Sequence, residues 1–380
     1  KENPMAKLLY IWYKRSKGIL EGGGQGSYRN YTQICQVLGE ENVDSFYVHD
    51  EYRKKTLWGY VKGLYFTLFN YYYGLTPGRV KEIVRIALGE QPLASTQSAH
   101  TYDYVFIDRS LFGIIAKQLK QAGYKGRIMV FFHNVETIYF NAKLGLVPGK
   151  QVFLRCVANN DAYSCLYADN PIAINQRDAD LLESMYGRKF ENVIPVSLAD
   201  RLVPADSLTE VQTRKRPQCL FLGAYFPPNN KGILWFVRNV KPFVDIEMII
   251  VGKGMSKLKA EAHELKDIEV IGDAPDLRPY FEEADIMVLP IFSGSGMKIK
   301  TCESLMYGKN IVGTQEAFEG YEGEYSRIGG KCNTAEEFIE VLQNFTSHPR
   351  PRFNTYSRQL FLDKYSNASS LEKFKMLFQE

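Results

Sequence analysis

Short apolar runs of strand length alternate with longer helical patterns along most of the chain. Arg127–Phe132 is an example, because it is apolar after its first residue and stops abruptly at polar residues. A strand that is buried on both faces is apolar throughout, whereas the helix that follows it is periodic. The alternation therefore predicts βαβ units, parallel sheets and the α/β class.

The predicted elements form two series. In the first half, strands are predicted at Lys7–Tyr13, Ser45–His49, Tyr104–Asp108, Arg127–Phe132, Pro171–Ile174 and Asn192–Val196. Helices of this half are predicted at Ser27–Leu38, Ser110–Gln121 and Gln176–Tyr186. In the second half, strands are predicted at Gln218–Leu222, Glu247–Val251, Ile268–Ile271, Ile286–Pro290 and Asn310–Gly313. Its helices are predicted at Lys231–Val240, Ser256–Leu265, Thr301–Tyr307 and Thr334–Asn344, and a helical tail at Tyr356–Phe378 breaks near Ser366–Ser370.

A polar stretch with mixed charge separates the two series. We expect a Rossmann-like first domain at 1–203 with an insertion at 52–99, a linker at 204–217, a second Rossmann-like domain at 218–355, and a terminal helix at 356–380. Two doubly wound sheets of this kind are expected to face each other across a cleft. Ligands of open α/β sheets bind outside the carboxyl ends of the strands, so the loops that follow strands are the candidate sites.

Composition narrows the class of protein further. The 380 residues are 45% hydrophobic and 24% charged, which excludes a disordered or fibrous chain. The 47 basic and 43 acidic residues give a formal charge of +4, too balanced for a dedicated nucleic-acid binder. No apolar run reaches the roughly 18 residues that would span a bilayer. The 6 cysteines form no CxxC pair, so we expect no disulfide framework, no zinc site and a cytoplasmic location.

The loop after the first predicted strand is rich in glycine. It contains Gly24 and Gly26 just before the helix predicted to begin at Ser27. Glycines let a backbone approach a ligand closely, and helix N-termini attract anions, so a diphosphate or sugar cradle is one reading. A flexible connection is the other. The dinucleotide fingerprint GxGxxG fails, because Arg29 stands where its third glycine would be.

His133 directly follows the apolar strand Arg127–Phe132. An imidazole at this place is suited to hydrogen-bond a substrate hydroxyl or to act as a general base. The alternative is a buried histidine satisfied by a neighbouring carbonyl.

The first strand of the second half leads into a loop that starts at Gly223 and carries Asn229, Asn230 and Lys231. We expect one of the asparagines to cap the following helix. Lys231 in the first helical turn opposes the helix dipole, a cost that a bound anion would offset.

The loop after Ile286–Pro290 carries the strongest signal. Its candidate ligand-binding residues are Gly294, Ser295, Gly296, Met297, Lys298, Lys300 and Glu303. A glycine turn before a helix predicted to begin near Met297 directs backbone N–H groups at one point. Lysines at this end oppose the helix dipole but suit a bound diphosphate. A solvated pair between Lys300 and Glu303 is the alternative.

With these motifs together, Leu220–Gly320 resembles the donor-binding half of retaining glycosyltransferases of the GT-B fold, family four, in the subgroup with a GSG-x-K-x-K signature. The matching segments are FLGAYFPPN, IVGKGMSKL, VIGDAPDLRPYFEEADIMVLP, GSGMKIKTCESLMYGK and IVGT. The first half matches through GGGQG and FFHNVE, and the helical tail resembles the segment that crosses back to the first domain.

The resemblance implies sugar transfer from a nucleoside-diphosphate-sugar donor with retention at the anomeric carbon, without a metal or other cofactor. It places Glu303 on the ribose, with Ser295 in place of the family's first glutamate. The resemblance also implies that Lys298 and Lys300 neutralise the diphosphate and that Lys298 is a catalytic residue. His133 would lie near the reacting face of the sugar. Gly24 or Gly26 would close over the phosphates. A nucleotide-sugar epimerase of the same architecture and a non-catalytic binding module are the alternatives.

The acceptor would be a saccharide or a lipid-linked saccharide used for bacterial surface polysaccharide. Basic and aromatic residues interleave in the insertion at 52–99, which suits a segment resting on the inner face of the cell membrane. The alternative is that these aromatic residues form the core of a helical insertion.

Overall fold

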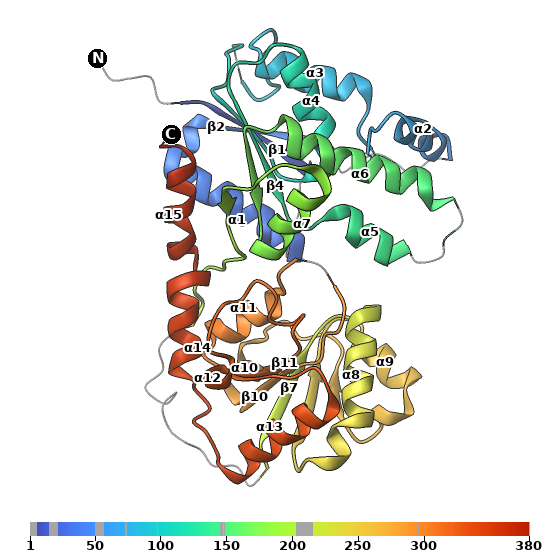
Figure 1. Ribbon diagram of the computed structural model, residues 1–380, viewed down its shortest axis with the longest axis vertical. Coiled ribbons are helices and arrows are strands. Elements are labelled where there is room, and N and C mark those ends of the chain that lie inside the picture. The colour runs from blue at the N-terminus through green and yellow to red at the C-terminus, as the bar shows by residue number, and fades with distance from the viewer. Residues whose placement is uncertain are drawn as a thin grey trace. The chain divides into compact units, whose positions relative to one another are not determined.

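The computed structural model (Figure 1) describes residues 6–14, 22–49, 57–72, 74–96, 98–144, 147, 149–202, 216–294 and 296–379. The chain divides into two compact units. Unit 1 comprises Lys1–Pro195 and Leu371–Glu380, and unit 2 comprises Val196–Ser370. Residues 204–215 of the expected linker lie outside the described residues.

Unit 1 is built on a six-stranded parallel sheet with the order β2-β1-β3-β4-β5-β6. The strands are β1 Leu8–Lys14, β2 Val43–His49, β3 Tyr104–Ile107, β4 Arg127–Phe132, β5 Asn170–Ala173 and β6 Asn192–Val193. Side chains alternate between the two faces of a strand, so Leu9 and Ile11 join the hydrophobic core on one face. Tyr10 points to the other face, where its ring packs edge-on against Tyr31 of α1.

The helices of unit 1 cover both faces of this sheet. They are α1 Gly22–Leu38, α2 Leu57–Leu68, α3 Pro77–Ala87, α4 Gly113–Gln121, α5 Glu136–Leu144, α6 Lys150–Tyr167 and α7 Gln176–Tyr186. Figure 1 shows α3, α4 and α6 on one side of the sheet and α1 on the other. The prediction that the first helix begins at Ser27 is wrong, because α1 begins at Gly22 and takes the glycines into its first turns.

Unit 2 has a second parallel sheet of six strands, with the order β12-β11-β10-β7-β8-β9. The strands are β7 Gln218–Leu222, β8 Glu247–Val251, β9 Glu269–Ile271, β10 Ile286–Leu289, β11 Asn310–Gly313 and β12 Gly329–Lys331. Its helices are α8 Pro227–Asn239, α9 Met255–Glu261, α10 Arg278–Glu283, α11 Ile299–Met306, α12 Tyr325–Ile328, α13 Ala335–Ser347 and α14 Thr355–Leu360.

Two helix starts in unit 2 differ from the predicted ones by more than one residue. Helix α8 begins at Pro227 rather than Lys231, because prolines with their fixed φ angle fit the first turn of a helix. Helix α11 begins at Ile299, between the starts predicted near Met297 and at Thr301, and Lys298 occupies the N-cap position.

The helical tail continues from α14 through a π-helical turn, Phe361–Tyr365, to α15 Asn367–Leu377. Ser366 separates these two segments with an extended backbone, within the range of the predicted break. Phe374 near the end of α15 lies close to the guanidinium of Arg29, and the ring of Phe378 packs against Tyr104, all within unit 1. In the described part of the chain, no helix combines the length and the apolar character needed to cross a membrane.

Candidate functional site

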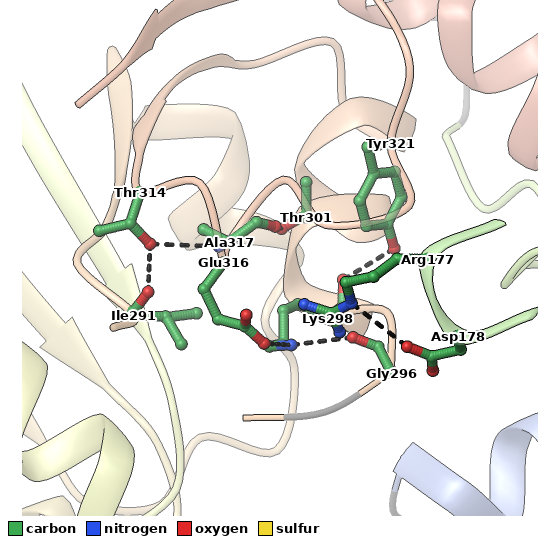
Figure 2. A network of polar contacts seen from close by, with 10 residues as sticks. All are labelled: Arg177, Asp178, Ile291, Gly296, Lys298, Thr301, Thr314, Glu316, Ala317 and Tyr321. Atoms are coloured by element: carbon green, nitrogen blue, oxygen red, sulfur yellow. Dashed lines mark hydrogen bonds and ion pairs between the residues drawn. The ribbon is translucent and has the colours of Figure 1, made fainter. Parts of the chain in front are cut away.

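Three loops of unit 2 meet at one edge of its sheet. They follow β7, β10 and β11, which are neighbours and parallel, so their carboxyl ends lie side by side. Side chains hold the loops after β10 and β11 together (Figure 2). Thr314 donates a hydrogen bond to the carbonyl of Ile291, and Thr301 of α11 donates one to the carbonyl of Ala317 at 2.6 Å. These contacts give the β10–α11 loop a defined position.

Lys298 lies in this loop, and both its side chain and its backbone carbonyl make hydrogen bonds. Its Nζ atom donates to Oε1 of Glu316 at 2.6 Å and to the carbonyl of Gly296 at 2.8 Å (Figure 2). The hydroxyl of Tyr321 donates to the backbone carbonyl of Lys298 at 2.8 Å. The side chains of Lys298 and Glu316 are only 12% and 17% exposed. The ammonium is thus held at the sheet edge, and Glu316 is a site residue that the sequence did not reveal.

Lys300 brings the loops after β7 and β10 together. Its Nζ atom donates to Oδ1 of Asn229 at 2.9 Å and lies 4.9 Å from the ring centre of Phe221. Burial and, to a smaller extent, the nearby charge of Lys298 lower the pKa of Lys300, whereas Glu303 opposes the shift, and together they bring it to about 7. Two ammonium groups therefore converge at this edge.

Asn229 does not cap α8, so that prediction is wrong. The N-cap residue is Phe226, whose side chain makes no capping hydrogen bond. The side-chain oxygen of Asn230 accepts a hydrogen bond from the backbone N–H of Phe226 at 3.2 Å. Asn229 donates to the carbonyl of Ala224 at 2.9 Å and uses its oxygen for Lys300. The prolines at the start of α8 leave these asparagines inside the helix.

The glycines of these loops are packed against site residues. A Cβ atom on Gly294 would lie 3.0 Å from Cε of Lys298, and one on Gly223 would lie 3.1 Å from Cγ of Asn229. Gly296 has a φ of 60°, which favours glycine. Ser295 lies outside the described residues.

Met297 and Glu303 complete the predicted residues of unit 2. Met297 is buried, and its sulfur accepts a hydrogen bond from the backbone N–H of Val196 at 3.3 Å, so its role here is packing. Glu303 lies one turn after Lys300 on α11. Burial raises the pKa of Glu303, while the positive charges of Arg201 and Lys300 oppose the rise.

His133 lies at the carboxyl end of β4 in unit 1. Its Nε2 atom is 3.4 Å from Oδ1 of Asp108, which follows β3 and is fully buried. The same oxygen accepts hydrogen bonds from the Tyr10 hydroxyl at 2.7 Å and from the Asn30 amide at 3.0 Å. The partner of His133 is therefore a carboxylate, not the backbone carbonyl of the alternative reading.

Gly26 lies directly against this histidine. A Cβ atom on Gly26 would be 3.2 Å from Cε1 and 3.3 Å from Nδ1 of His133. Gly24 belongs to the same first turns of α1. The glycine segment thus lies beside the imidazole edge that does not face Asp108.

The predicted insertion has two kinds of apolar residue. Those of α3, among them Val80 and Ile83, are buried. Four large side chains at the end of α2, Leu64, Tyr65, Leu68 and Phe69, are 54–64% exposed. The alternative that the aromatic residues form a core is therefore wrong for Tyr65 and Phe69. The basic residues at 53–55 lie outside the described residues.

A large part of unit 2 matches a known protein family. Residues 216–345 match the model of a family described as Glycosyl transferases group 1. An uncharacterized 44.6 kDa protein in the cps region of Klebsiella pneumoniae is 27% identical over 179 residues, which cover 42% of this chain and 45% of that protein. The chain thus spans less than half the length of this relative.

Solved structures are similar over nearly the whole chain. Sucrose-phosphate synthase from Thermosynechococcus elongatus superposes with a TM-score of 0.68 at 13% identity, covering 98% of both chains. Anabaena Alr3699/HepE in complex with UDP-glucose gives a TM-score of 0.63 at 12% identity, covering 98% of this chain and 100% of that one. The lipopolysaccharide outer core galactosyltransferase WaaB gives 0.64 at 12% identity, with 98% and 100% covered.

The chain has the GT-B fold. The two parallel sheets predicted from the apolar runs are the two sheets of this fold. At these identities the likeness to solved structures concerns the fold alone. Within the described ranges, no three His, Cys, Asp or Glu side chains gather as the ligands of a metal ion would.

Proposed function

We propose that this chain is a retaining glycosyltransferase that moves a sugar from a nucleoside-diphosphate-sugar donor to a saccharide or lipid-linked saccharide acceptor. The observation that carries the proposal is the convergence of the Lys298 and Lys300 ammonium groups at the carboxyl edge of the unit 2 sheet. Two cations beside a glycine turn fit the two negatively charged groups of a diphosphate. The family match over 216–345 and the fold shared with a UDP-glucose complex support the same donor class.

In the transfer step, the bond between the anomeric carbon and the diphosphate oxygen breaks, and both electrons leave with the diphosphate. The acceptor hydroxyl oxygen bonds to the same carbon, and its proton passes to the departing diphosphate oxygen. Negative charge therefore grows on the leaving group, where Lys298 and Lys300 stabilise it. Glu303 is assigned to the ribose hydroxyls, and His133 to a hydroxyl of the donor sugar near its reacting face. No metal is assigned to the reaction.

A lipid-linked acceptor is supported by the exposed apolar side chains at the end of α2. Leu64, Tyr65, Leu68 and Phe69 would enter the interface of the inner leaflet. A role in bacterial surface polysaccharide is supported by the relative in the cps region and by the shared fold of WaaB. Co-sedimentation with anionic vesicles tests this part: wild type should pellet with the vesicles, and Leu68→Ser/Phe69→Ser should remain in the supernatant.

The reaction is tested by incubating the protein with UDP-, GDP- and dTDP-sugars and following release of the nucleoside diphosphate. Slow donor hydrolysis is the result expected of a transferase that lacks its acceptor. Isomerised donor without release would instead indicate an epimerase. Binding without any turnover would indicate a binding module. Either of the last two outcomes contradicts the proposal.

A further inference from the structure

Glu316 reaches Lys298 from a neighbouring loop. Glu316 follows β11, whereas Lys298 follows β10, and their side chains form an ion pair at 2.6 Å that is mostly shielded from solvent. Oε1 of Glu316 is also 3.4 Å from the position that a Cβ atom of Gly294 would take. The carboxylate therefore lies beside the glycine turn, where we place the diphosphate.

The second lysine is held differently. The hydrogen-bond acceptor of Lys300 is the neutral amide of Asn229, and its other close partner is the ring of Phe221. Glu303 attracts Lys300 electrostatically but is itself next to the positive charge of Arg201. Glu316 is thus a carboxylate bonded directly to one lysine of this pair. It supplies there the negative charge that a bound anion would supply.

This inference rests on the proposed function. We propose that Glu316 is an internal counter-ion that the diphosphate displaces from Lys298, and that its competition for this ammonium lets the nucleoside diphosphate product leave. A carboxylate and a phosphate are both anionic acceptors, so they compete for the same N–H donors. Product release limits turnover in many enzymes, and a competitor within the protein shortens the lifetime of the product complex.

The variant Glu316→Gln tests the competition, because glutamine keeps the shape and one acceptor oxygen but removes the charge. Glu322→Gln is the matched control, since it removes the same charge from an exposed pair with Lys364 in the same unit. Calorimetric titration with UDP, GDP and dTDP first identifies the nucleotide that wild type binds. We expect Glu316→Gln to bind it about three- to tenfold more tightly, and Glu322→Gln to bind it like wild type.

Equal or weaker binding by Glu316→Gln, with binding by wild type intact, would overturn the counter-ion role and leave the proposed function standing. Failure of wild type to bind any of the three nucleotides would contradict the proposed function itself. When Lys298 is already replaced by glutamine, the further substitution Glu316→Gln should change the Kd for the nucleotide by less than about twofold. An undiminished effect there would mean that Glu316 repels the phosphates directly rather than acting through Lys298.

The release step has its own readout. In Glu316→Gln, kcat at saturating donor and acceptor should fall, whereas the rate of a single turnover should stay at the wild-type value. A structural defect would lower both rates together. Unchanged kcat combined with tighter product binding would overturn the part of the proposal that concerns release.

Discussion

The Nε2 atom of His133 lies 3.4 Å from Oδ1 of Asp108, and both side chains are buried in unit 1. Burial alone would raise the pKa of Asp108. The charge and hydrogen bond of His133, together with Ser27 and Arg109, outweigh burial and hold that pKa below its ordinary value. The carboxylate thus stays ionised and fixes the side of the imidazole that faces it.

Asp108→Asn should reduce the free energy of unfolding by about 1–3 kcal/mol, because hydrogen bonds to a charged acceptor are stronger than those to a neutral amide. A lowered folded-state pKa contributes stability above the unfolded pKa of about 4, and this is lost as the pH falls through the folded value. Urea denaturation at pH 7 and at lower pH measures the effect. The difference between variant and wild type should shrink on acidification, and equal midpoints at pH 7 would contradict this prediction.

Gly26→Ala should separate stability from activity. Alanine favours the helical backbone of α1 by about 0.5–1 kcal/mol relative to glycine, so the fold should not be weakened. Its Cβ atom would nevertheless press on the ring of His133, so transfer activity should fall. Gly78→Ala in α3 is the control, because a Cβ atom there meets nothing within 4 Å. Equal activity of both variants would show that the space beside His133 is unimportant.

Nucleotide binding should depend on pH through Lys300, whose pKa is about 7 in the folded protein. The protonated form attracts the diphosphate, so affinity should fall as the pH rises from about 7 to 9. Lys300→Arg stays charged throughout this range and should bind with a flatter profile. Because the nucleotide itself titrates identically with both proteins, the comparison isolates the side chain. Parallel profiles of wild type and variant would rule out this role for Lys300.

Lys300 should also make the free energy of unfolding depend on pH. Its folded pKa is below its unfolded value of about 10.4, so the unfolded chain binds more protons between these limits. The contribution of Lys300 to the free energy of unfolding should therefore rise with pH from about 7 to 10. Lys300→Met, which carries no titrating group, should show a smaller rise in denaturation experiments over this range. An identical rise in both proteins would contradict the assignment.

Lys298→Ala should lower kcat by about a hundred- to a thousandfold, the usual cost of losing one group that stabilises a developing negative charge. Lys364→Ala, which breaks the exposed pair with Glu322, serves as the control and should keep wild-type turnover. Turnover is followed as release of the nucleoside diphosphate. A Lys298→Ala enzyme that turns over like wild type would remove this lysine from the mechanism.

The sheets were predictable because strands buried on both faces are apolar. Strands β4, β7, β8 and β11 coincide with the predicted ranges. Helix α6 was not predicted, since Asn160, Asp161 and Ser164 interrupt the apolar residues on its buried face. Asn160 accepts a hydrogen bond from the backbone of Ile114, so this face of α6 combines polar and apolar contacts. Strand β12 begins with two glycines and was missed because it shows no apolar run.

The predicted site residues stay predictions, although the structure shows which of them lie together. Lys298 and Lys300 stood out because lysine is unfavourable near a helix N-terminus. The pairing of Glu316 with Lys298 and that of Asp108 with His133 could not be predicted, because these contacts depend on which strands are neighbours. The sequence gives one indication that Asp108 is a site residue, because its carboxylate directly follows an apolar strand. It gives none for Glu316, because several glutamates follow β11.

Binding of a nucleoside diphosphate to unit 2 tests the central claim most directly. UDP, GDP and dTDP are titrated calorimetrically into wild type, Lys298→Ala/Lys300→Ala and the control Lys364→Ala. We predict that wild type and control bind one of these nucleotides with the same Kd, and that the double variant binds it at least about a hundredfold more weakly. Equal affinity of the double variant and wild type would contradict the account.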